Sequence, residues 1–543
     1  MTVFASKISN ISETFRQNKA DMTDLVACLR EYEARAESLS EKRRPRFEKR
    51  GQLTPRERLK RLLDPGMPFV ELYNMANFLI DDPDPETSIP GASAISGIGF
   101  VSGVRCLVIV DDSGINAGAI TTGSIQKMLG ILKIALHQKL PLIHLVESAG
   151  ANLMQYTVEL WAYGGGMFHG RAKLSAAGIP TIVVLHGPST AGGAYQPGMS
   201  DYVIGVKNNG MAALAGAALT QAATGEIADE RELGGTEMHA SVTGLVEYLA
   251  EDDAHGILIC RDIVDRLDWN KNCVLSQHED ISPPLFDPKE LAGVVPVDYK
   301  IAYDVREVMT RIVDGSNFVE FKPRFGPSTV CVQAKIFGHA VGIIGNNGPL
   351  DPNGAAKATH FFQLCDQSDM PIIFLNNITG YMVGTEYEHL GMIKLGAKMI
   401  QAVSNVRVPK ITLYIGASFG AGNYGMCGYA YEPDFIFAWP NASTGVMGGE
   451  QAAMTMDVVM RAGAKRRGEE IDQKMEKKMA AQKQAIIDHF EPQSNAFYTS
   501  GRMLDQGVID PRDTRKIIGF SLDTCREARS RTLQANSFGV ARI

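Results

Sequence analysis

The sequence contains few cysteines, no long apolar run and no excess of positive charge. Only eight of its 543 residues are Cys, and none has CxxC spacing, so neither a zinc site nor a redox dithiol is indicated. No run of about 18 apolar residues occurs, and we predict no membrane span. The formal net charge of −7 gives no electrostatic reason to expect a nucleic-acid partner.

Signals for export and for side-chain catalysis are also missing. Residues 1–21 lack the basic and apolar segments of a signal peptide, and scattered cysteines in a large chain are typical of a reducing compartment, so we predict a cytoplasmic protein. HExxH, P-loop and strand-linked GxGxxG motifs are absent. The histidines lack metal-ligand spacing, and we expect them to be structural: His144, His186, His239, His360 and His389. For Asp111–Asp112 and Asp252–Asp253 we expect helix or loop capping.

What the chain does contain is a repeat. Residues 180–195 read PTIVVLHGPSTAGGAY and residues 409–424 read PKITLYIGASFGAGNY. In each, Pro opens an apolar run that ends in a loop of small residues followed by Tyr. Ala191–Gly193 aligns with Gly420–Gly422. We therefore expect two buried strands, each leading into a loop whose backbone N–H groups a ligand can approach closely.

The repeat extends beyond these loops. Residues 68–72 resemble 317–321, and residues 140–150 resemble 370–380, in the same order and at offsets of 249 and 230 residues. A repeat this long indicates duplication of a whole domain rather than a solenoid. We predict two domains, residues 1–280 and 281–543.

Apolar runs alternate with helical segments in both halves, which is typical of an α/β fold. Residues 280–300 contain four prolines and have the composition of a linker. A single charged helix is expected over 463–488, without a counterpart in the first half. Residues 11–63 are expected to be helical, and their basic cluster is either a solvated helix face or a contact for an anionic group such as a CoA phosphate: Lys42, Arg43, Arg44, Arg46, Lys49 and Arg50.

Two glycine-rich loops without side-chain catalysts favour chemistry performed by backbone donors. Paired N–H groups stabilise the oxyanion that forms when a carbonyl becomes an enolate. The alternative is that each loop is only a tight turn.

At these residues the chain resembles the carboxyltransferase (β) subunits of biotin-dependent acyl-CoA carboxylases, a branch of the crotonase-like superfamily. The resemblance runs from about residue 50 to about residue 520, and its second half is most similar to methylcrotonyl-CoA and geranyl-CoA carboxylase β subunits. It rests on long ordered blocks: GQLTPRERLKRLLDPGMPFVEL (51–72), SAAGIPTIVVLHGPSTAGGAYQPGMSD (175–201), NNITGYMVG (376–384), GASFGAGNYGMCG (416–428) and WPNASTGVMGGEQAA (439–453).

The resemblance implies two tandem crotonase-like domains, the first for acyl-CoA and the second for carboxybiotin. Carboxyl transfer from carboxybiotin to an acyl-CoA enolate would then use two backbone oxyanion holes. The implied oxyanion-hole residues are Ala191, Gly192, Gly193, Gly420, Ala421 and Gly422. Implied acyl-CoA contacts are Ala117, Gly118, Ala119, Gly150, Gly164 and Tyr195. Implied biotin contacts are Phe419, Asn423, Tyr424, Thr379 and Gly380.

The resemblance also implies partners. No ATP-grasp signature is present, and Lys398 lacks the flanking pair of Met residues of a biotinylated carrier. Biotin is therefore expected on a separate α subunit that carries the biotin carboxylase and carrier domains. The β subunits are expected to form a homo-oligomer, a hexamer, with the active site between the first domain of one subunit and the second domain of another. No metal is expected.

The acyl group stays open. Gly164 aligns with a Phe of methylcrotonyl-type chains, so it either leaves room for a longer acyl chain or marks a helix irregularity. Two further interpretations of the whole chain stand beside the carboxylase: the carboxyltransferase subunit of a biotin-dependent acyl-CoA decarboxylase, and a catalytically silent scaffold.

Overall fold

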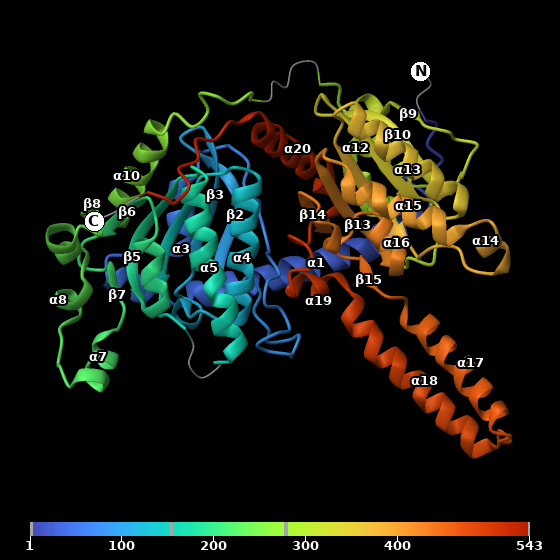
Figure 1. The fold of residues 1–543 in the computed structure, drawn as a ribbon, viewed down its shortest axis with the longest axis horizontal. Coiled ribbons are helices and arrows are strands. Elements are labelled where there is room, and N and C mark those ends of the chain that lie inside the picture. The colour runs from blue at the N-terminus through green and yellow to red at the C-terminus, as the bar shows by residue number, and fades with distance from the viewer. Residues whose placement is uncertain (1–3, 152–155, 276–280, 541–543) are drawn as a thin grey trace. The chain divides into compact units, whose positions relative to one another are not determined.

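The computed structural model describes residues 4–151, 156–275 and 281–540. Within it the chain divides into two compact units. The N-unit comprises Arg30–Gln277, Gly501–Met503 and Asp523–Ile543. The C-unit comprises Met1–Leu29, His278–Ser500 and Leu504–Leu522. Each unit contains one mixed sheet with helices packed on it (Figure 1), as expected for an α/β protein.

The N-unit sheet has the strand order β1-β2-β3-β4-β5-β6-β8, and β7 pairs with β5. β1 and β2 are antiparallel to their neighbours, whereas β3 to β6 and β8 are parallel. Its strands are β1 (Val70–Glu71), β2 (Ala94–Val101), β3 (Val104–Asp111), β4 (Leu142–Ser148), β5 (Thr181–Thr190), β6 (Tyr202–Val206), β7 (Met211–Ala213) and β8 (Tyr248–Ala250).

The C-unit sheet follows the same plan with the order β9-β10-β11-β12-β13-β14, and β15 pairs with β13. Even the irregularities correspond, because the register shifts between Val146 and Ser148 and again between Asn376 and Ile378. Its strands are β9 (Phe318–Glu320), β10 (Thr329–Ile336), β11 (His339–Asn346), β12 (Ile372–Ile378), β13 (Lys410–Phe419), β14 (Phe435–Ala438) and β15 (Ser443–Gly445).

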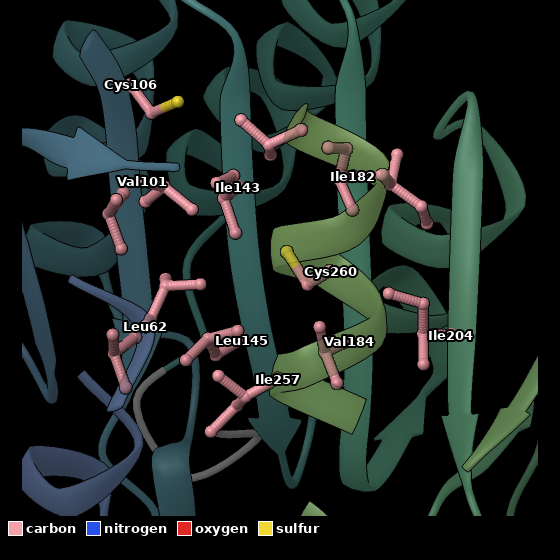
Figure 2. Packing of buried hydrophobic residues seen from close by; sticks show 14 of the residues in the cluster. Leu62, Val101, Cys106, Ile143, Leu145, Ile182, Val184, Ile204, Ile257 and Cys260 are labelled. Carbon is pink, nitrogen blue, oxygen red and sulfur yellow. The ribbon is translucent and has the colours of Figure 1, made fainter. Parts of the chain in front are cut away.

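The central strands are buried on both faces, as parallel strands covered by helices must be. On one face of the N-unit sheet, alternate residues such as Ile143 and Ile182 pack against Ile257 and Cys260 of α10 (Asp253–Arg266) and against Leu62 of α3 (Pro55–Leu62). Figure 2 shows α10, with Ile257 and Cys260, packed along these strands. Most of these side chains are fully buried, so this layer is the core of the N-unit.

Helices at corresponding positions start with corresponding caps. The Thr121 hydroxyl accepts from Ser124 N at the start of α4 (Thr122–His137), and the Asp351 carboxylate accepts from Gly354 N at the start of α13 (Pro352–Gln367). Such caps satisfy backbone donors that a helix leaves free. The remaining N-unit helices are α2 (Arg44–Lys49), α5 (Val158–Ala176), α6 (Tyr195–Gly198), α7 (Ala217–Thr224), α8 (Glu230–Gly234) and α9 (Thr236–Met238).

In the C-unit, α13 and α15 (Met392–Asn405) pack on β12 through Phe361, Met399 and other buried residues. Its other helices are α11 (Leu291–Val294), α12 (Arg306–Ile312), α14 (Thr385–His389), α16 (Gly420–Gly425), α17 (Gly449–Arg466) and α18 (Gln473–Ser494). Three helices are divided between the units: α1 (Glu13–Glu41), α19 (Ala496–Gly501) and α20 (Thr514–Ser530). None of the helices in the described ranges is long and apolar enough to cross a membrane.

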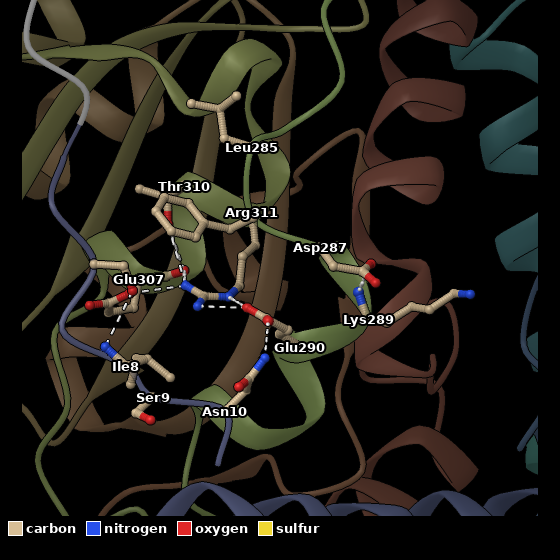
Figure 3. Close-up of polar contacts among 12 residues, drawn as sticks. Ile8, Ser9, Asn10, Leu285, Asp287, Lys289, Glu290, Glu307, Thr310 and Arg311 are labelled. Carbon is tan, nitrogen blue, oxygen red and sulfur yellow. Dashed lines mark hydrogen bonds and ion pairs between the residues drawn. The ribbon is translucent and has the colours of Figure 1, made fainter. Parts of the chain in front are cut away.

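The start of the chain belongs to the C-unit because polar contacts hold it there. Arg311 pairs with Glu307 and with Glu290 at 2.9 Å each, as Figure 3 shows. Asn10 donates to Glu290 at 3.3 Å, and Lys7 N donates to Glu307 at 2.7 Å. The two acids thus bind both the buried Arg311 and the N-terminal segment.

Two local predictions were wrong. Residues 463–488 are not one helix, because Gly468 at φ +68 ends α17 and a new helix, α18, begins at Gln473. The two helices lie side by side (Figure 1). The segment 281–300 is not a loose linker either, since Leu291 and Val295 are buried in the C-unit. Pro288 begins a short 3-10 turn there instead.

Candidate active site

The two glycine-rich loops have similar backbones, although residues 191–194 form a 3-10 turn and residues 420–425 an α-helical turn. Each directly follows a strand, β5 or β13, and enters a short helical turn. Ala191 has φ +53, and Gly420 at the matching position has φ +54. This left-handed conformation is strained for Ala. Burial matches as well: from Ala191 to Tyr195 and from Gly420 to Tyr424 the second and fifth residues are exposed, and the third and fourth are buried.

The first loop lies beside the ends of β3 and β4. A Cβ added to Gly150, which has φ +82, would lie 3.2 Å from the Thr190 carbonyl oxygen. The carbonyl of Gly118 accepts from the Ser148 hydroxyl at 2.7 Å, and Ala117 O accepts from Ala149 N at 3.1 Å. The predicted contacts at 117–119 and 150 therefore gather at the edge of the sheet where the loop at 191–193 begins.

A pocket of about 500 Å³, including open solvent, lies at this edge. Gly118, Ala119 and Ser148 line it beside the strand ends, and Gln196 lines it from α6. Apolar side chains of α4 and α5 also line it: Met128, Ile131 and Met167. A mostly apolar cavity with a few polar groups is the ordinary form of a small-molecule site.

Lys127 is the buried cation of this pocket. Its Nζ donates to the carbonyl oxygens of Ala94 at 2.7 Å and Gly91 at 3.1 Å. Burial lowers the pKa of Lys127 to about 8, because desolvation penalises the charged form more than the nearby Glu71 carboxylate favours it. Lys127 thus ties the segment before β2 to α4.

The two remaining predicted acyl-CoA residues lie on α5 and α6. Gly164 is buried in α5, which continues unbroken through residues 164–166, and a Cβ there would lie 3.4 Å from Ile125 of α4. The structure therefore excludes a helix break at Gly164. Tyr195 is exposed, and its ring packs edge-on against Phe168 at 5.3 Å.

The second loop is supported by its own side chain. Asn423 Nδ2 donates to Ser418 Oγ at 2.8 Å and to the Tyr414 hydroxyl at 3.1 Å. Gly422 needs to be Gly, because a Cβ there would lie 2.8 Å from Ile378 and 3.0 Å from Gly380 Cα. Gly380 itself has φ +134.

The predicted biotin contacts divide into two groups. Phe419 and Asn423 are buried, and the Phe419 ring packs edge-on against Tyr299 at 5.3 Å. Thr379 and Tyr424 are exposed. The first group shapes the loop from within, whereas the second presents side chains to the surface. Their contact with biotin stays a prediction.

Residues 416–420 spell Gly-x-Ser-x-Gly, a pattern found in serine hydrolases, and need separate attention. In those enzymes the Ser lies on an exposed turn beside a histidine base. Here Ser418 lies on β13, is fully buried and accepts from the Asn423 amide. An amide cannot serve as the base, so this Ser is structural. Among the described residues no group of three metal-ligating side chains occurs.

The buried charged groups near the first loop carry no shared signal in the sequence. His144 and His186 were expected to be structural, and both are hydrogen-bonded within the core: His144 to Asp111 at 2.9 Å and His186 to Asp253 at 2.8 Å. Asp252 caps α10 as expected, but Asp253 also pairs with Arg58 at 2.9 Å. No regular spacing in the sequence links these residues, which come from separate elements.

Comparison with known proteins shows the class of this chain. The family described as carboxyl transferase domain matches residues 46–540. The chain therefore belongs to the carboxyl transferase domain family, which confirms the resemblance read from the sequence.

Individual relatives agree with this assignment along nearly the whole chain. The solved β subunit of geranyl-CoA carboxylase from P. aeruginosa is 47% identical with a TM-score of 0.92, and all of both chains is covered. The probable biotin-dependent acyl-coenzyme A carboxylase beta2 subunit of Mycobacterium tuberculosis is 46% identical over 92% of each chain. The mitochondrial methylcrotonoyl-CoA carboxylase beta chain of Arabidopsis thaliana is 42% identical over 98% of this chain and 90% of its own.

Proposed function

We propose that this chain is the carboxyltransferase subunit of a biotin-dependent acyl-CoA carboxylase. The observation that carries the proposal is the pair of matching loops, in which backbone, burial and preceding strand correspond. A short helical turn that starts directly after a strand leaves its first N–H groups without intrahelical acceptors. Such donors suit a carbonyl oxygen that gains negative charge.

The two units take different substrates in this proposal. The N-unit binds acyl-CoA, with the thioester oxygen at Ala191–Gly193. The C-unit binds the biotin ring, with the ureido oxygen at Gly420–Gly422. The matching strand orders support an origin of the two units as tandem crotonase-like domains by duplication. Carboxybiotin, which a partner α subunit delivers, supplies the carboxyl group.

The residues of the second loop fit a planar ring of this kind. Gly420 and Gly422 let the loop pack closely on the protein, since an added Cβ would lie 3.1 Å from Val446 O at Gly420 and 2.8 Å from Ile378 at Gly422. Ala421 is exposed between them. The chain's own part is to orient both substrates and to stabilise two oxyanions without a side-chain base.

The pocket and Gly164 support an acyl group longer than a short straight chain. Gly164 adds no side chain between α4 and α5, the two helices that contribute Met128 and Met167 to the pocket, although Gly164 does not itself line it. Whole-length similarity to the geranyl-CoA carboxylase subunit points the same way. We propose a homo-oligomer of β subunits, a hexamer, in which the two substrate sites face each other across a subunit boundary. The cytoplasmic location stays a prediction.

The test is an assay of the complex of this chain with its biotinylated partner. Acetyl-, propionyl-, methylcrotonyl-, geranyl- and long-chain acyl-CoA are each incubated with ATP and labelled bicarbonate. We expect label to enter at least one branched or long acyl-CoA, and none when the partner is omitted. Carboxylation by the isolated chain would refute the need for a partner. No carboxylation of any acyl-CoA by the intact complex would refute the function, leaving the decarboxylase or the scaffold. The exposed small residues of both loops speak against a scaffold.

A further inference from the structure

A series of buried, hydrogen-bonded polar residues lies near the first loop in the N-unit. Asp111 Oδ1 lies 2.9 Å from His144 Nε2, and Arg171 Nη2 lies 3.2 Å from His144 Nδ1. Arg171 Nη1 then donates to Ser200 Oγ at 3.0 Å, and the Ser200 hydroxyl donates to the carbonyl oxygen of Gln196 at 2.7 Å. These five residues come from β3, β4, α5 and the α6 segment.

The direction of each bond follows from the chemistry of the groups. A guanidinium has only donors, so His144 Nδ1 must accept from Arg171, and Nε2–H must donate to the Asp111 carboxylate. A neutral imidazole therefore bridges a buried anion and a buried cation. Burial lowers the pKa of Arg171 to about 10, although Asp111 and Asp201 oppose the shift.

Both ends of this series of hydrogen-bonded residues reach the proposed acyl-CoA pocket. Asp111 and Gln196 line it from opposite ends of the series. Gln196 lies three residues after Gly193, on the same short helix as Tyr195. The carbonyl of Gln196 is where Ser200, held by Arg171, binds this turn.

The C-unit shows that this fold does not require such a series. At the position of His144 on the matching strand it has Phe374, and at the position of Asp111 it has Asn346. Phe374 is fully buried in an apolar cluster. The charged series is thus a feature of the acyl-CoA side alone.

We propose that Asp111, His144, Arg171 and Ser200 are positioning residues for carboxyl transfer. They hold the turn after Ala191–Gly193 at a set distance from the part of the pocket that Asp111 lines. The proposal rests on the proposed function. Loss of the connection displaces the backbone donors from the thioester oxygen, and small displacements at a reacting centre cost large factors in rate.

The test uses the complete complex and four variants. Ser200→Ala removes only the last hydroxyl, and Arg171→Met and His144→Phe break the middle, the latter with the side chain found at the matching C-unit position. Arg171→Lys restores a cation. We expect kcat to fall about tenfold for Ser200→Ala and about a hundredfold for Arg171→Met and His144→Phe, with partial recovery in Arg171→Lys. The KM for the biotinylated carrier should be unchanged.

Ser175→Ala is the matched control, because Ser175 lies on the same helix and donates to Asp201 at 2.5 Å, next to Ser200 but off the series. It should keep the parent kcat. Circular dichroism and thermal unfolding identify variants that do not fold. If Arg171→Met and His144→Phe do not fold, the kcat of Ser200→Ala alone tests the proposal. Parent kcat in Ser200→Ala and in the folded mid-series variants, or an equal loss in Ser175→Ala, would overturn the proposal. An inactive parent complex would instead refute the proposed function.

Discussion

The loop at 191–193 and the loop at 420–422 can be compared residue by residue, because each follows the same strand of its sheet. Their backbones correspond, but their supports do not. In the C-unit the fourth loop residue is Asn423, which binds Ser418 and Tyr414 with its own amide. In the N-unit the fourth residue is Ala194, and Ser189, the counterpart of Ser418, is buried with no hydrogen-bond partner for its Oγ in the structure.

The difference shows that one backbone geometry can be held in two ways. The C-unit uses neutral groups within the loop itself, whereas the N-unit uses a charged series that connects the loop to a pocket. A ligand with a large flexible acyl part needs a pocket coupled to its oxyanion site, and a biotin ring does not. The two loops should therefore respond alike to steric block and differently to loss of polar groups.

The largest effect is expected from added bulk at the exposed second position of either loop. Gly192→Val and Ala421→Val should each lower kcat about 10²-fold or more, because the side chain covers the backbone donors. Both sites are exposed, and a Cβ at 192 meets only Phe168 at 3.7 Å, so the melting temperature should hardly change. Gly198→Ala, in open space after the first loop, is the control and should keep full turnover. Equal turnover in all three variants would show that these loops are not the oxyanion sites.

The second largest effect is expected in the pH dependence of stability, which should have opposite signs in the two units. Burial alone would raise the pKa of Asp253 in the N-unit, but His186, Arg58 and Leu53 N lower it to about 2. Burial raises the pKa of Asp505 in the C-unit to about 7. An Asp in the unfolded chain has an ordinary pKa of 3.8. Because the pKa of Asp253 is lower in the folded state, Asp253 stabilises the fold above about pH 4, and this stability is lost as the pH falls toward 2. Asp505 costs stability as the pH rises from about 4 to 7.

Asp505→Asn should remove the second effect. We expect the free energy of unfolding at pH 7.5 to rise by about 2–4 kcal/mol, since the Asn side chain has no proton to lose. Its oxygen can still accept from Ser500 and Gly507 N, as Asp505 Oδ1 does at 2.7 and 2.9 Å. Calorimetric scans at pH 5 and 7.5 measure this, with Asp513→Asn, a change at a half-buried position, as control. A parent protein whose C-unit is equally stable at both pH values would contradict it.

The smallest expected effect is a difference in stability between variants that lack the Ser hydroxyl before each loop. Ser418→Ala should lower the free energy of unfolding by about 1 kcal/mol through the lost hydrogen bond with Asn423. Ser189→Ala should be neutral or slightly stabilising, because it removes a buried hydroxyl without a partner. Urea titrations of both variants give the comparison. Turnover should survive in Ser418→Ala, and a loss of several orders of magnitude would instead mark Ser418 as a nucleophile.

Much of this could be predicted from the sequence because apolar runs and small-residue loops are local signals. The two buried strands expected before the small-residue loops are β5 and β13, and the helical segments expected between the apolar runs include α4 and α13. The helix over 463–488 was predicted as one because its charge pattern continues through Gly468, whose positive φ is a backbone property.

The candidate site likewise contains residues that the sequence reveals and residues that it does not. The loops and their glycines could be found from the repeat alone, since a left-handed φ at Gly420 and close packing at Gly422 leave a direct mark on residue type. The series from Asp111 to Ser200 could not, because its members lie 27 to 33 residues apart on different elements. The register of β3 and β4 brings Asp111 next to His144, and the packing of α5 and the segment after α6 on the sheet adds Arg171 and Ser200.

The most direct test is a structure of the assembled complex, with the biotinylated partner and an acyl-CoA bound, by electron cryomicroscopy. The account predicts the thioester oxygen about 3 Å from N–H groups of residues 191–193, and the biotin ureido oxygen at the same distance from those of residues 420–422. Density for either ligand at a different place in the assembly, with both loops empty, would contradict it.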